Sequence, residues 1–197
     1  MLPAMSASED QKSIRFASAA EWERWLGENH RDCDGVWIKM AKRASGVDGV
    51  RYPEVLESAL CYGWIDARRE ALDERFFLQR FTPRRTRSRW SRINRETAER
   101  LISEGRMRPS GLAQVERAKA DGRWEAAYES QARSRIPEDL ERELDARPAA
   151  KASFERLNSQ NRYAILYRLA DAKRAETRER RLAKFVEMLE AGKTIYP

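Results

Sequence analysis

The chain has 197 residues, which suits one domain or one unit with a helical extension, and 41% of them are apolar, enough to bury a core. Charged residues reach 36% and the formal net charge is +7, a balance that favours anionic over cationic partners and predicts many exposed helical faces. The first 13 residues contain Glu9 and Asp10 but no apolar stretch, so they predict neither a signal peptide nor a membrane span, and we expect a cytoplasmic protein with no integral membrane segment.

The first half of the chain predicts a mixture of helices and strands. Ser18 and Glu21 form a capping box, the pattern in which each side chain bonds the backbone amide of the other at a helix start. Strands are indicated where apolar and polar residues alternate, and glycines mark the stops. The predicted elements are a helix from Ser18 to before Asp34, a strand at 36–43, a helix from Pro53 to Gly63, and strands at 64–69 and 75–81 that end before Pro83.

From Ser91 onward the sequence predicts only helices. Prolines at first helical positions and glycines after last ones mark the boundaries, and apolar residues recur three and four positions apart. The predicted helices run from Ser91 to Gly105, from Pro109 to about Gly122, from Pro137, from Pro148, from Asn158 or Ser159, and through Leu182, Phe185, Val186 and Leu189 to Gly192.

These elements predict an α+β fold with a small antiparallel sheet and helices in the N-terminal half, followed by a mainly helical C-terminal half. We expect a disordered tail over residues 1–15, an α+β core with an arginine-rich loop over 16–130, and a helical region over 131–197 that packs on this core.

An arginine-rich run follows the last predicted strand. No acid occurs between Glu74 and Glu96, and eight arginines fall inside this window: Arg75, Arg80, Arg84, Arg85, Arg87, Arg89, Arg92 and Arg95. Because neighbouring guanidinium groups repel one another, the run requires an anionic partner, which is either a ligand, a nucleic acid, a lipid surface or acids of the protein itself.

Part of this run predicts an anion-binding site. In an extended segment alternate residues face opposite sides, so the odd-numbered arginines would share one side and Trp90 would lie on the other. An indole beside guanidinium groups suits a phosphate or a base, and the start of the following helix would add backbone amides. The candidate residues are Arg84, Arg85, Arg87, Arg89, Trp90, Ser91 and Asn94, with Trp64 and Asp66 in an orienting role.

A second interpretation of the same run stays open. Residues Arg84 to Arg95 would then pair with Glu and Asp of the helical half, and Trp90 would belong to the core. In either case Asp66 is expected to orient a guanidinium rather than act as a general base, because positive charge nearby keeps a carboxylate deprotonated and weakly basic.

Signals for catalysis and metal binding are weak. His30 is the only histidine, so any histidine-dependent nucleophile would need it, and it lies in a charged helix end. Cys33 and Cys61 lie far apart without a C-x-x-C motif, which predicts two free thiols. No glycine-rich phosphate-binding motif occurs. We therefore expect no catalytic residues, no metal and no cofactor.

A series of motifs resembles the bacterial YdeI/OmpD-associated family, also called bacteriocin-protection proteins. The motifs are Gly35–Lys39, Leu60–Asp66, Phe81–Arg84, Ser88–Asn94, Glu104–Met107, Pro109–Leu112, Ala118–Trp124 and Ala172–Arg178, so that the resemblance covers roughly Phe16 to Gly192. It implies a role in tolerance of bacteriocins or cationic antimicrobial peptides, and some members are described as periplasmic. The family supplies no catalytic residues. Ala67 stands where the family usually has glycine, and a strand that continues there would explain the difference.

Together these patterns favour a protein that acts by binding rather than by catalysis. A chain with a net charge of +7 should repel a cationic peptide, so we expect an anionic small molecule as its partner. Nucleic-acid binding is the alternative, and an enzyme acting on a phosphorylated or carboxylated small molecule is the second alternative.

Overall fold

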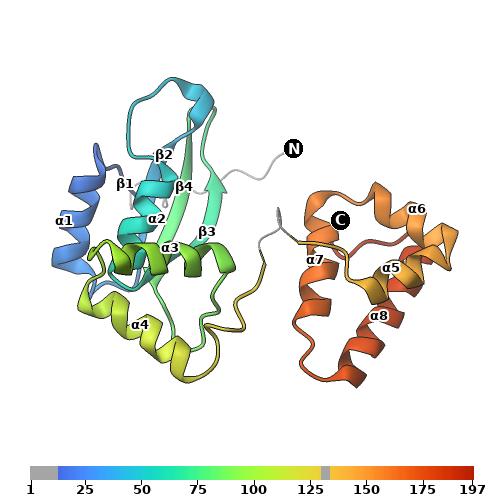
Figure 1. Ribbon diagram of the computed structural model, residues 1–197. Helices are drawn as coiled ribbons and strands as arrows, with labels where there is room; N and C mark the ends of the chain where they lie inside the picture. Colours follow the sequence, from blue (N-terminus) through green and yellow to red (C-terminus); the bar gives the residue numbers. More distant parts are fainter. Residues whose placement is uncertain (1–12, 130–133) are drawn as a thin grey trace. The chain divides into compact units, whose positions relative to one another are not determined.

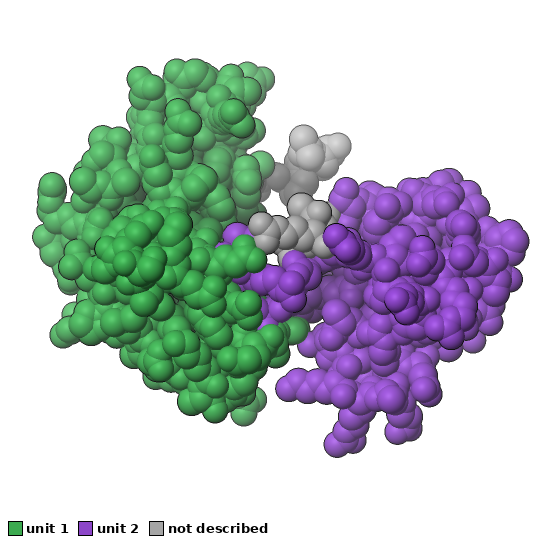
Figure 2. All heavy atoms as spheres, viewed as in Figure 1, with its two compact units in different colours: residues 1–90, 94–126 green, residues 91–93, 127–197 purple. Residues whose placement is uncertain are grey.

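The computed structural model of the protein describes residues 13–129 and 134–197 (Figure 1). It divides into two units, one formed by the residues up to 90 together with 94–126, the other by 91–93 together with 127–197 (Figure 2). The boundary expected at residue 130 lies outside the described residues, and so does most of the tail expected at 1–15.

The first unit combines one sheet with helices, which confirms the expected α+β class. Its elements are β1 (Ser13–Ile14), α1 (Ala19–Asn29), β2 (Val36–Ala41), the 3₁₀ helix η2 (Arg43–Ser45), α2 (Tyr52–Cys61), β3 (Trp64–Ala71), β4 (Phe76–Pro83), α3 (Arg92–Ser103) and α4 (Pro109–Ala120). The first two residues of α3 are grouped with the second unit.

The four strands form a sheet in the order β1, β2, β4, β3, in which β4 is antiparallel to both of its neighbours. β1 is parallel to β2, with Ser13 opposite Trp37, so the sheet is mixed and the prediction of an antiparallel sheet was wrong in this respect. Two residues are too few to carry an alternating pattern, and both lie in the segment predicted to be disordered.

One face of the sheet packs against α1 and α2. The predicted N-cap of α1 is confirmed, since the Ser18 hydroxyl accepts from the Glu21 amide, but the Glu21 carboxylate accepts from the Ala17 amide rather than from that of Ser18, so the capping box is only half formed. Trp22 of α1 is fully buried, and its ring centroid lies 5.8 Å from that of Phe81 in β4. Its indole Nε1 donates to a carbonyl of α2 at 3.0 Å, which joins both helices to the sheet.

The end of α2 meets the first turn of α4 at close range. A Cβ atom added to Gly111 would lie 2.2 Å from the Cys61 carbonyl oxygen. The Arg108 amide donates to the same carbonyl at 3.0 Å. Gly63, directly after α2, has a φ of +80°, a left-handed conformation that glycine adopts without strain. The backbones of the two helices are therefore in direct contact, with no side chain between them.

β3 forms one edge of the sheet and is irregular near its centre. Its register against β4 shifts between Asp66 and Arg69, which marks a β-bulge. Ala67 lies in this bulge, so the strand does continue through the position at which glycine was expected. The neighbouring Arg68 and Arg69 are exposed along the edge.

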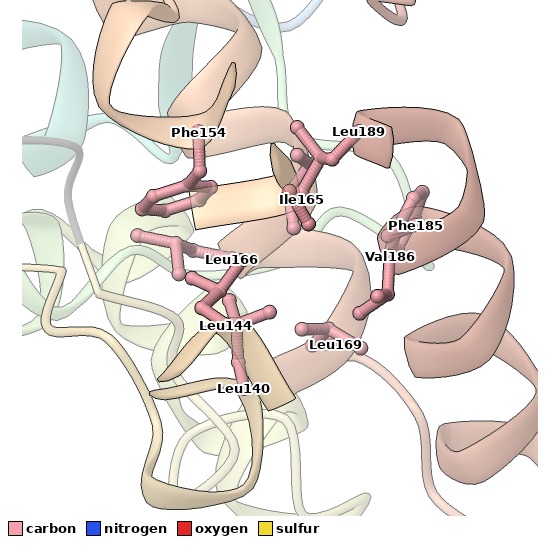
Figure 3. Close-up of a cluster of buried hydrophobic side chains, with 10 residues drawn as sticks. Leu140, Leu144, Phe154, Ile165, Leu166, Leu169, Phe185, Val186 and Leu189 are labelled. Carbon is pink, nitrogen blue, oxygen red and sulfur yellow. The ribbon is translucent and has the colours of Figure 1, made fainter. Parts of the chain in front are cut away.

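The second unit is helical in its described part, as expected for the C-terminal half. It contains α5 (Glu138–Asp145), α6 (Pro148–Arg156), α7 (Ser159–Ala170) and α8 (Ala175–Glu190). All four helices contribute to one apolar core, part of which is drawn in Figure 3: Leu140, Leu144, Ala150, Phe154, Ile165, Leu166, Leu169, Phe185, Val186 and Leu189.

Polar contacts fix the ends of these helices. Arg178 of α8 donates to both carboxylate oxygens of Asp139 in α5, at 2.6 Å and 2.8 Å. Asn158 caps α7 by accepting from the Asn161 amide, which confirms one of the two predicted caps. Asn161 is itself 2% exposed, and its side-chain oxygen accepts from the amides of Ile195 and Tyr196. The C-terminal segment is thereby fixed to α7.

Candidate anion-binding site

The arginine-rich run forms a loop between β4 and α3 whose backbone is held at several points. The Arg84 amide donates to the Gly63 carbonyl at 2.9 Å. Arg85 and Ser88 close a turn, because the Ser88 amide donates to the Arg85 carbonyl and the Ser88 hydroxyl accepts from the Arg85 amide, each at 2.9 Å. The guanidinium of Arg123 donates to the Ser88 carbonyl at 2.6 Å. The loop is thus a fixed structure rather than a simple connection.

Arg84 and Trp90 lie inside the first unit, at the two ends of the loop. Arg84 is 5% exposed and Trp90 is 2% exposed. The Arg84 guanidinium carbon lies 3.6 Å from the centroid of the Trp90 ring, a cation–π contact, and Arg84 also donates to the Arg89 carbonyl at 3.1 Å. On its other side Trp90 meets the ring of Trp124 edge-on at 4.8 Å. Trp90 therefore belongs to the core, as the second interpretation of the sequence has it.

Arg85, Arg87 and Arg89 are exposed, but so is Thr86, which alternation had put on the other side, because residues 85–88 form a turn and not the extended segment that was expected. Within the described part of the chain, the side chains of Arg85 and Arg87 form no hydrogen bond, ion pair or ring contact, whereas Arg89 has a partner. Two guanidinium groups thus project into solvent from a turn that hydrogen bonds fix. They are the part of the run that is open to an anion.

Ser91 and Asn94 lie at the start of α3, where backbone amides were expected to face the same anion. Ser91 instead pairs with Tyr128 in an isolated parallel bridge. The amide of Arg92 donates to the Tyr128 carbonyl at 2.8 Å, and the Arg92 guanidinium lies 2.5 Å from a Glu129 carboxylate oxygen. Asn94 is half-buried and has a partner as well. The first amide of the helix is therefore already occupied.

The two residues expected to orient the arginines have other partners. Trp64 lies opposite Pro83 in the sheet, next to the start of the loop, but it is buried and its Nε1 donates to the His30 carbonyl at 3.1 Å. Asp66 accepts a hydrogen bond from the Tyr52 hydroxyl at 2.8 Å. Trp64 thus joins the sheet to the end of α1, and Asp66 joins it to α2.

The arginines after the loop pair within the protein, as the second interpretation expects. In addition to Arg92, Arg95 lies 3.6 Å from Glu99 one helical turn on and donates to the Trp124 carbonyl at 3.3 Å. Arg123, which fixes the turn, is itself paired with Asp121 at 2.8 Å. The role of Arg123 could not be predicted from the sequence, because this residue follows α4 and is far from the loop along the chain.

Groups with the chemistry for catalysis or metal binding occupy structural positions. The Nδ1 atom of His30 lies 2.8 Å from the Leu26 carbonyl, at the end of α1. Cys33 and Cys61 are free thiols, and burial raises the pKa of the Cys61 thiol to about 11. In residues 13–129 and 134–197, no three His, Cys, Asp or Glu side chains are grouped so as to hold a metal ion. Nor does this part of the chain include a helix long and apolar enough to cross a membrane.

Two family models match the chain. Residues 14–114 match a family described as a domain of unknown function (DUF8412), and residues 125–192 match the family described as Bacteriocin-protection, YdeI or OmpD-Associated. No curated protein and no solved structure gives a significant match. Most motifs that indicated the second family lie before residue 125, in the part matched by the first. The chain therefore belongs to the DUF8412 family, whose match covers just over half of it, and its residues 125–192 confirm the resemblance to the YdeI/OmpD-associated, bacteriocin-protection family.

Proposed function

We propose that the protein is a non-enzymatic member of the bacteriocin-protection group and binds an anionic small molecule through the turn Arg85–Ser88. One observation carries this proposal: Arg85 and Arg87 are exposed and unneutralised by any described acid, on a turn held by Ser88 and Arg123. The repulsion between two neighbouring cations decreases when an anion binds both of them. An occupant with two or more oxyanion groups therefore suits the turn.

The fixed backbone supports binding of such an occupant. Ordering a flexible loop costs free energy at the moment of binding, and a turn that is already hydrogen-bonded avoids most of that cost. Below the turn, the contact between Arg84 and Trp90 keeps both loop ends in the core. Arginine also binds phosphate and carboxylate oxygens through two parallel hydrogen bonds, which favours these two classes of ligand.

Binding rather than catalysis is the proposed activity, because the acid nearest to the loop in the sheet, Asp66, is engaged by Tyr52. A general base has to reach the proton that it abstracts, and Asp66 serves the sheet instead. We propose the cytoplasm as the site of action, which the free thiols of Cys33 and Cys61 support.

Calorimetric titration with pyrophosphate at low salt tests the proposal. We expect the wild type to bind and the double variant Arg85→Gln/Arg87→Gln to bind at least about tenfold more weakly, because each charge-assisted hydrogen bond contributes about 1.5–3 kcal/mol. The matched control is Arg174→Gln/Arg180→Gln, at the N-cap of α8 and within that helix, which removes two positive charges from exposed positions elsewhere.

The control separates a site from a general charge effect. If both double variants lose the same affinity, pyrophosphate binding depends only on the net charge of the protein, and the turn is not a binding site. Absence of heat from wild-type protein at low salt would equally refute the proposal. Since the tryptophan in the loop is buried, calorimetry is a better measurement here than intrinsic fluorescence.

A further inference from the structure

The face of the sheet opposite to α1 carries aromatic and basic side chains. Along β2 the residues alternate, so that Trp37 points away from the buried side chains of Val36 and Ile38. The strand register sets Trp37 opposite Arg80 and Ala41 opposite Phe76, which puts Trp37, Phe76 and Arg80 on this second face. We call these residues, together with Lys39 and Arg15, the basic sheet face.

Two rings on the basic sheet face are surrounded by cations. The Arg80 guanidinium carbon lies 5.9 Å from the centroid of the Trp37 ring. The ring of Phe76 has Lys39 at 4.9 Å and Arg15 at 5.5 Å. Both rings are only half-buried. Aromatic surface and positive charge thus alternate along the face.

Two acids near this face have structural partners. Asp73 accepts from the amides of Arg75 and Phe76, each at 2.7 Å, and closes the turn before β4. Glu70 lies 2.6 Å from Arg68 on β3. The described cations in contact with the two rings are Arg15, Lys39, Arg75 and Arg80, and this combination of positive charge and aromatic surface suits a negatively charged partner.

We infer that the basic sheet face binds single-stranded nucleic acid, with bases on Trp37 and Phe76 and phosphates beside the cations that flank them. Stacking requires bases with an open π-face, which a duplex does not offer, and every base has one, so binding would tolerate different sequences. Leu78 lies between Phe76 and Arg80 on the same face and is buried, so the surface between the two rings is apolar at its base. A polyanion without bases would use the cations but not the rings.

This inference is independent of the turn Arg85–Ser88. The residues of the basic sheet face belong to β2, β4 and the segment after β1, whereas the turn lies beyond Pro83. Loss of pyrophosphate binding in the turn variant and loss of base stacking on the sheet are therefore separate outcomes.

The test is fluorescence anisotropy of the full chain with a labelled oligothymidine of about 12 nucleotides at low salt. We expect Trp37→Ala and Phe76→Ala each to weaken binding by about five-fold to a hundred-fold, the range for loss of one stacked base. Trp37→Phe keeps a ring and should retain most of the affinity. Tyr196→Ala is the control, since it removes an exposed ring from the second unit. Thermal melts establish that each variant is folded.

Two competitors complete the design. Unlabelled duplex and heparin should displace the oligothymidine less well than unlabelled oligothymidine does, because neither offers open bases. Arg80→Gln should lower the slope of log affinity against log salt by about 0.7, the value for one contact with a single strand. Equal competition by heparin, unchanged affinity in folded Trp37→Ala and Phe76→Ala, or no binding by the wild type would overturn the inference.

Discussion

Replacing Gly111 with alanine should destabilise the first unit. The added Cβ would lie 2.2 Å from the Cys61 carbonyl oxygen, so α2 and α4 would have to separate by about 1.2 Å to reach ordinary contact at 3.4 Å. Overpacking of this kind costs about 1–3 kcal/mol. The separation also weakens the hydrogen bond from the Arg108 amide, worth about 1 kcal/mol, while alanine regains about 1 kcal/mol of helix propensity. The net loss of unfolding free energy is about 1–3 kcal/mol.

Urea denaturation followed by tryptophan fluorescence measures this loss for the first unit alone, because all six tryptophans lie between residues 22 and 124 and within that unit. The melting temperature should fall by roughly 5–15 °C. Gly27→Ala in α1 is the matched control: the nearest atom to its added Cβ, the Tyr62 hydroxyl, is 3.5 Å away, so this variant should be as stable as the wild type or more stable. If Gly111→Ala is no less stable than Gly27→Ala, close backbone contact does not hold α2 against α4.

Further predictions concern the second unit and the thiols. Asn161→Ala should release the C-terminal segment, at a cost of about 1–3 kcal/mol, and carboxypeptidase should then remove terminal residues faster while the helical circular dichroism stays unchanged. A hydrogen bond from Arg178 lowers the pKa of the Asp139 carboxyl below its usual range, so its stabilising effect is present above the usual pKa and is lost as the pH falls below about 4. The Asp139→Asn variant should lack this loss of stability at low pH. The measurement is unfolding followed by circular dichroism, which reports both units, in comparison with tryptophan fluorescence, which reports the first unit. At pH 8 a disulfide reagent should modify Cys33 in the native protein and Cys61 only after unfolding, since Cys61 is buried and its pKa is raised; equal rates would contradict this.

The helices and strands were predictable because their signals are local. The N-cap at Ser18, the prolines that begin α4 and α6, and the alternation along β2 each act over a few residues. The short strand at Ser13 and Ile14 was not predicted, because it exists only through pairing with β2. Tertiary contact, rather than propensity, decides such short strands.

The candidate site was predictable only in part. Arg85, Arg87 and Arg89 are exposed as expected, but the alternation behind that expectation does not hold, since residues 85–88 form a turn in which Thr86 is exposed as well. The sequence pattern could not reveal that Arg84 stacks on Trp90, because this contact depends on how the loop folds back on itself. Nor could it reveal that Trp124 covers the other side of this ring or that Arg123 holds the turn, since these two contacts join segments distant in the sequence. The number of positive charges in the run can be counted from its residues. Only the fold determines which of the guanidinium groups remain in solvent.

The bulge in β3 also limits how a protein partner could bind. A peptide that extends a sheet needs a regular row of backbone donors and acceptors along an open edge. The register shift between Asp66 and Arg69 interrupts that row, and the exposed side chains of Arg68 and Arg69 crowd it with charge. Recognition by strand addition is thereby disfavoured at this edge, and a partner in this region has to be bound through side chains.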